Sequence, residues 1–137
     1  MSPAKPATSS RRPVRNQRGS ASVELVLLLP ALFAVMFLGM QAALFYHARS
    51  TAIAAAEEGA RAAGGENASA SDGISAAHAF LTDAGGQDVL RGATAEVDRT
   101  ATTVTVTIRG SSLSVIPGWS PMVVQHASVT VERLTTP

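Results

Sequence analysis

The longest hydrophobic stretch of the chain runs from Leu25 to Tyr46 and contains no charged side chain. At ~1.5 Å of rise per residue, its about 22 residues would form a helix roughly 33 Å long, enough to cross a hydrocarbon layer of about 30 Å. The stretch is apolar on every side, and the rest of the chain is too small to surround it, which argues against a buried core helix. We therefore predict a transmembrane span at 25–46. Pro30 should bend or loosen this helix, because proline lacks a backbone N–H group.

The residues that follow the span continue its helical pattern. The segment "ARSTAIAAAEEGARAA" (Ala48–Ala63) consists mainly of strong helix formers and precedes the glycine pair at 64–65. We predict one long helix over 20–63. Its stripe of small side chains would allow close packing, either against neighbouring copies or against the chain's own domain.

Beyond a linker at 64–71, the pattern predicts a small α+β domain over 72–137. The segment "SDGISAAHAFLTDAGG" has the apolar spacing of a short helix, with Ser71 or Asp72 as its cap and Gly85 at its end. Alternation of apolar and polar residues then predicts three antiparallel strands, at 93–99, 101–110 and 122–134. The predicted fold class is therefore α+β: a long transmembrane helix, one short helix and a three-stranded antiparallel sheet.

Charge is distributed unevenly along the chain. Residues 1–19 are rich in Ser, Pro, Ala and Arg without apolar periodicity, which predicts a disordered leader. This leader carries no acid and five cations, namely Lys5, Arg11, Arg12, Arg15 and Arg18. Positive charge before a span predicts a cytoplasmic N-terminus and an extracytoplasmic domain. Acids outnumber arginines after the leader, so the body lacks the basic stripe of a nucleic-acid-binding protein.

Glu24 stands at the threshold of the apolar run, where a carboxylate is costly to bury. Cleavage after Gly19 would create a partner for it, the new α-amino group of Ser20. The Ser20 amine of one copy could then pair with Glu24 of the next copy in a low-dielectric bundle. Glycine suits such a cleavage site because it lets the chain lie extended against a protease.

These residues resemble a known family. The segment "RGSASVELVLLLPALF" is similar to the class III signal of type IV pilin-like proteins, and more closely to the TadE-like minor pseudopilins of tight-adherence (Tad) pilus systems. Two further details are similar to that family. One is Pro30 within the span, and the other is the segment Glu58-Gly59-Ala60-Arg61 after it. The resemblance covers residues 18–63.

The resemblance implies roles for individual residues. A membrane prepilin peptidase would cut after Gly19, making Ser20 the mature N-terminus, and Glu24 and Arg18 would guide recognition or assembly. The partners implied are this peptidase, other pilin-like subunits, the Tad assembly proteins and the lipid bilayer. The implied function is that of a structural and assembly component of a Tad-type pilus or related secretion system in the cell membrane.

The sequence offers no pattern typical of an enzyme. It has no cysteine, no His-x-x-Glu-His and no Gly-x-Ser-x-Gly, so we expect no catalytic site, metal or cofactor. Two other interpretations remain open. One is an uncleaved single-span anchor that displays a small binding domain, and the other is a secreted protein cut near Ala48.

Overall fold

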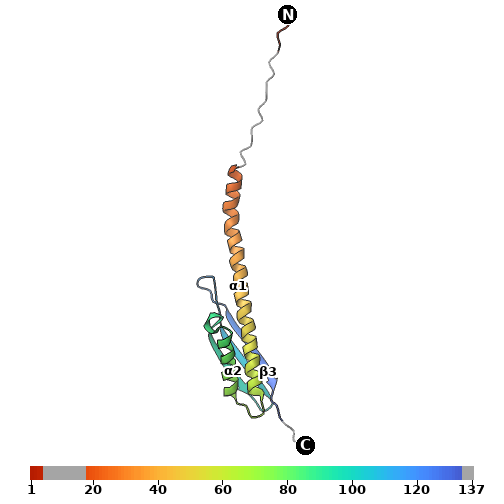
Figure 1. Ribbon diagram of the computed structural model, residues 1–137, viewed down its shortest axis with the longest axis vertical. Helices are drawn as coiled ribbons and strands as arrows, with labels where there is room; N and C mark the ends of the chain where they lie inside the picture. Colours follow the sequence, from red (N-terminus) through yellow and green to blue (C-terminus); the bar gives the residue numbers. More distant parts are fainter. Residues whose placement is uncertain (5–17, 134–137) are drawn as a thin grey trace. The chain divides into compact units, whose positions relative to one another are not determined.

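The computed structural model describes residues 1–4 and 18–133, so most of the predicted leader lies outside the described residues (Figure 1). The described elements are α1 (Arg18–Gly64), α2 (Ala70–Asp83), the short 3-10 helix η1 (Gly86–Asp88), β1 (Leu90–Arg99), β2 (Thr103–Ser112) and β3 (Met122–Thr130). The predicted α+β fold class is confirmed: one long apolar N-terminal helix precedes a short helix and a three-stranded antiparallel sheet.

Helix α1 is 47 residues long and continues through Pro30. It belongs to two compact units, one covering Met1–Ala34 and the other Val35–Pro137. At its C-terminal end, the Arg99 side chain donates hydrogen bonds to the Ala63 and Gly65 carbonyl groups at 3.0 and 3.3 Å. The Glu132 N–H group donates to the Gly64 carbonyl at 2.9 Å. The helix therefore ends near the predicted glycine pair, but groups from the sheet satisfy its last carbonyls, and neither glycine adopts the left-handed backbone.

The three strands form a meander in the order β1-β2-β3 with antiparallel pairing. Val106 at the middle of β2 lies opposite Val97 on one side and Ala127 on the other. An irregularity between Arg91 and Thr94 lengthens β1 toward Leu90, three residues before the predicted start. β3 ends at Thr130, earlier than predicted, because alternation alone does not mark where pairing stops.

The second half of α1 and all of α2 lie on one face of the sheet (Figure 1). The buried apolar residues are mostly alanines on the helices and β-branched residues on the strands. They are Ala48, Ala52, Ala55, Ala56, Ala60, Ala63, Ala77, Leu81, Leu90, Val104, Val106, Ile108 and Val123. Of the two packing partners considered for the small-residue stripe, the structure therefore selects the chain's own sheet.

Helix α2 begins at Ala70, two or three residues earlier than the two predicted caps imply. Its N-cap is Ser69, not Ser71 or Asp72. The Ser69 hydroxyl oxygen accepts a hydrogen bond from the Asp72 N–H group at 3.3 Å, and the Asp72 carboxylate accepts one from the Ser69 N–H group at 2.7 Å. This reciprocal pair is a capping box, which satisfies two of the unpaired donors at the start of the helix.

Candidate functional site

The residues predicted for cleavage and recognition lie at the start of α1. The helix begins at Arg18, so Gly19, Ser20 and Glu24 are all helical. Glu24 is exposed and stands beyond the first helical turn, where the favourable effect of the helix N-terminus has largely faded. Among the described residues, no ion pair involves Glu24. A strong partner for this carboxylate would therefore have to come from outside the described part of the chain.

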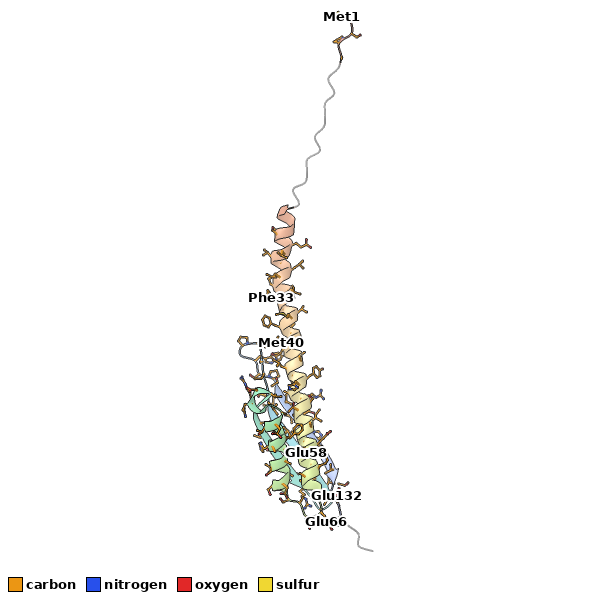
Figure 2. All side chains as sticks on the ribbon, in the orientation of Figure 1. Met1, Phe33, Met40, Glu58, Glu66 and Glu132 are labelled. Atoms are coloured by element: carbon orange, nitrogen blue, oxygen red, sulfur yellow. The ribbon has the colours of Figure 1, made fainter. Side chains whose placement is uncertain are left out.

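From residue 25 to residue 40 the apolar run after Glu24 is exposed in the structure. Its most apolar 18-residue window has a mean hydropathy of 2.4, and none of that window is buried. Figure 2 shows the Phe33 side chain, for example, pointing away from the helix. The helix is long and apolar enough to cross a membrane. An exposed apolar surface of this length fits a lipid-facing segment and not the core of a soluble domain.

The segment Glu58-Gly59-Ala60-Arg61 divides its side chains between two faces of α1. Glu58 and Arg61 lie on the outward face and form an ion pair at 2.9 Å. Both side chains are substantially exposed, so this pair contributes little to stability. Gly59 and Ala60 lie on the opposite face and are buried.

Gly59 of α1 lies in close contact with Gly73 of α2. A β-carbon at Gly59 would lie 2.9 Å from the carbonyl oxygen of Gly73 and 3.2 Å from Val106 Cγ1. A β-carbon at Gly73 would in turn lie 2.8 Å from the carbonyl oxygen of Gly59 and 2.8 Å from Ala63 Cβ. Two glycines facing each other thus let the helix backbones touch while both helices pack on the sheet. The sequence signalled Gly59 through the family-like segment, but it gave no sign that Gly73 is its partner.

Gln41, the most polar residue of the predicted span, joins α1 to the loop between β2 and β3. Its side chain is only 3% exposed. The Oε1 atom accepts hydrogen bonds from the Val115 N–H group at 2.9 Å and the Ser114 hydroxyl at 3.0 Å, and Nε2 donates to the Leu113 carbonyl at 3.3 Å. Polarity alone marked Gln41 in the sequence, and its partners lie more than 70 residues away along the chain.

The described residues contain no group of three or more His, Asp or Glu side chains that could hold a metal ion. His78 and His126 are exposed and lie on different elements, α2 and β3. The candidate functional feature of the described residues is helix α1, which has an exposed apolar N-terminal part and a buried, alanine-rich C-terminal part.

Residues 19–61 match the family model described as TadE-like protein. The segment is TadE-like. The match begins at Gly19, the residue after which cleavage was predicted, and ends at Arg61, the last residue of the segment that carries Gly59. The resemblance stated from the sequence is confirmed, and at family level it relates the chain to the pseudopilins of Tad pilus systems. No curated protein and no solved structure matches the chain.

All of the matched residues lie in α1. The TadE-like segment contains the exposed apolar run and most of the alanine face, whereas α2 and the three strands lie outside the matched residues. The alanine face is the set of buried alanines on α1, namely Ala48, Ala52, Ala55, Ala56, Ala60 and Ala63. The sheet nevertheless packs against the TadE-like segment, because the segment and the strands share one hydrophobic core. Four alanines of the segment are fully buried in that core: Ala48, Ala52, Ala56 and Ala60.

Proposed function

We propose that this chain is a TadE-like pseudopilin, a structural and assembly component of a Tad-type pilus or related secretion system. One observation carries the proposal: the family match starts at Gly19 and includes Glu24 and the exposed apolar run in the order that the resemblance requires. The chain would be inserted with its N-terminus in the cytoplasm and its sheet outside, in keeping with the five cations before the span.

Processing after Gly19 is the first step of the proposed function. A membrane prepilin peptidase would remove residues 1–19 and leave Ser20 as the mature N-terminus. The freed ammonium of Ser20 would then pair with Glu24 of a neighbouring pilin-like subunit. The attraction between these two charges is stronger in a lipid-surrounded bundle than in water, because the surroundings screen the charges weakly.

Intact mass of the membrane-extracted protein tests the processing step. Cells with prepilin peptidase should yield a chain without residues 1–19, and cells without the enzyme should yield the full chain. An uncleaved anchor would keep residues 1–19 in both strains. A secreted protein would instead appear in the medium with a new N-terminus near Ala48, and either result would overturn the proposal.

Gly19→Val should abolish this processing. A β-carbon at Gly19 meets no atom within 4 Å, so its failure to be cleaved would not be explained by a clash of that atom. Gly39→Val provides the matched control, because Gly39 lies on the same helix and is equally open. The control should be cleaved normally, and equal cleavage of both variants would remove Gly19 from the proposed site.

Glu24→Ala tests the assembly step. The variant should still enter the membrane, since it removes a charge from the edge of an apolar span, but cross-linking to other pilin-like subunits should be lost. Glu66→Ala is the control, because Glu66 is an exposed acid outside α1. Undiminished cross-linking of the Glu24 variant would show that the carboxylate does not guide assembly.

A further inference from the structure

The loop between β2 and β3 is short and uncharged, and backbone hydrogen bonds close both its tip and its base. Its tip is a turn in which the Trp119 N–H group donates to the Ile116 carbonyl at 3.3 Å. Pro117 occupies the second position of the turn, and Gly118 has a φ of 76°, which is the glycine position of a type II turn. At the base, the Ser112 N–H group donates to the Pro121 carbonyl at 2.9 Å. The turn therefore sets the position of the Trp119 backbone.

This loop is attached within the apolar run of α1 and not beyond it. Gln41, which binds the loop through three hydrogen bonds, lies five residues before Tyr46, about 7.5 Å along the helix axis. An apolar groove of about 440 Å³ lies between the loop and the helix, lined by Leu38, Phe45 and Trp119 among others. The loop thus covers the final part of the same uncharged run that we assign to the membrane.

The exposed side chains at this end of the second compact unit are of the types that concentrate at a membrane interface. Trp119 is 49% exposed, and Tyr46 is 64% exposed. No charged residue occurs from Gly110 to Gln125, and Met122 in that range is also strongly exposed. Trp and Tyr concentrate where hydrocarbon meets headgroups, because their rings are apolar and their N–H or O–H groups need polar partners.

Charged residues occur nearby but are set back from the loop. Helix α2 ends at Asp83 and η1 ends at Asp88, at the same end of the sheet. Figure 1 shows the β2–β3 loop extending past α2 along α1, toward the N-terminal side of the helix. Water or headgroups at the depth of α2 would solvate these acids while the loop tip lies deeper.

We propose that the β2–β3 loop is a membrane anchor that seats Trp119 at the boundary between headgroups and acyl chains of the outer leaflet. The sheet is then held against the bilayer at a second point besides α1. This inference rests on α1 crossing the membrane, as the proposed function also requires. The occupant is lipid because the groove continues directly into the lipid-facing surface of α1, with Leu38 belonging to both.

Trp119 is the only tryptophan of the chain, so its fluorescence reports on the loop directly. The full chain is reconstituted into phosphatidylcholine vesicles, with and without bromine on the acyl chains near the headgroup. Brominated lipid should roughly halve the emission, since bromine quenches by contact and interfacial tryptophans lie at that depth. Aqueous acrylamide should quench the emission only weakly.

Two variants with a relocated tryptophan calibrate the experiment. In Trp119→Phe with Phe80→Trp, the new tryptophan lies on α2, partly buried against the core, and brominated lipid should not quench it. In Trp119→Phe with Phe33→Trp, the tryptophan lies in the apolar run and brominated lipid should quench it strongly. The second variant verifies that the chain is inserted.

The outcomes separate this inference from the proposed function. If brominated lipid quenches at position 33 but leaves Trp119 untouched and open to acrylamide, the loop anchor is wrong and the span stands. Trp119 could instead be protected from acrylamide, but not quenched by brominated lipid, only at a high protein-to-lipid ratio. That result would assign the loop to contacts between copies and would also overturn the inference. Absence of lipid quenching at position 33 would overturn the membrane span, and the loop anchor with it.

Discussion

At the scale of single residues, the close approach of Gly59 to Gly73 makes a sharp stability prediction. Gly59→Ala should destabilise the protein, because the new β-carbon would lie 2.9 Å from the Gly73 carbonyl oxygen, which belongs to the backbone and cannot easily move. Overpacking of this kind costs about 1–3 kcal/mol, so over most of this range it outweighs the roughly 1 kcal/mol that alanine gains over glycine in a helix. Thermal unfolding in mild detergent measures the difference.

Gly39→Ala is the matched control for this substitution. It lies on the same helix, and its β-carbon meets no atom within 4 Å. The control should leave the melting temperature unchanged or raise it, while Gly59→Ala lowers it. Equal melting temperatures for the two variants would contradict the tight contact between α1 and α2.

The hydrogen bonds of Gln41 give a second prediction at this scale. Gln41→Leu should speed amide exchange at Val115 about tenfold or more, because a buried N–H group that loses its partner costs roughly 1–3 kcal/mol. Gln87→Leu is the control, since Gln87 also accepts a backbone N–H group, that of Gly92, but elsewhere on the surface. Exchange at Val115 should not change in the control. Unchanged exchange in both variants would mean that Gln41 does not hold the loop.

Residue by residue, the sequence predicts types of environment better than partners. Alternation with threonines places Val104, Val106 and Ile108 on one face of a strand, and all three are buried. It could not pair Gly59 with Gly73, because a helix–helix contact leaves no local signal when both residues also fit ordinary helical positions. Gln41 was similarly ambiguous, since a polar residue in an apolar run can face a partner protein, water or its own chain.

At the scale of elements, the N-terminus of α2 depends on a capping box with a charged member. Hydrogen bonds from the Ser69 hydroxyl and the Ser69 N–H group lower the pKa of the exposed Asp72 carboxyl below its ordinary value of 3.8. A lowered pKa in the folded state means that this stabilisation is complete above the ordinary value and is lost as pH falls through the lowered one. Protection of the backbone amides in the first turn of α2 from hydrogen exchange should therefore decrease as the pH falls below the ordinary pKa of the carboxyl. Asp72→Asn should remove this part of the pH dependence. Amide exchange across the range measures both.

Ser69→Ala should reduce stability by about 1 kcal/mol through loss of the same cap. Ser71→Ala is the control, since the Ser71 hydroxyl bonds only the Ser69 hydroxyl among the contacts of this turn. Denaturant unfolding compares the two. A larger loss for Ser71→Ala would favour the cap suggested by the sequence over the one in the structure.

The elements themselves were largely predictable, and their ends were not. Long runs of consistent period identified α1, α2 and the three strands. The start of α2 was misplaced because Ser69, Ser71 and Asp72 are all good caps within four positions, and only the backbone at Ser69 decides among them. The 3-10 helix at Gly86–Asp88 was missed, since a single turn has no periodicity to detect.

At the scale of the whole molecule, the alanine face of α1 is the cover of the sheet as well as the continuation of the span. The sequence left two partners open for that face, because a stripe of small residues permits close approach without specifying to what. The second compact unit, which begins at Val35, contains both the face and the sheet. The part of the TadE-like segment from Val35 to Arg61 therefore forms one structural unit with the residues outside the family match, and assembly of this part of the helix into a filament would carry the sheet with it.

This arrangement predicts how fragments behave. A fragment that starts at Val35 keeps the alanine face, Gln41 and the sheet, and should show a cooperative thermal transition in mild detergent. A fragment that starts at Gly65 exposes Val104, Val106 and Ile108, and each buried side chain of this size contributes about 1.5–3 kcal/mol by leaving water. It should lose both the transition and the amide protection of β2, as measured by hydrogen exchange. Equal protection of β2 in the two fragments would mean that the sheet folds without α1, and that the TadE-like helix is an anchor attached to an independent domain.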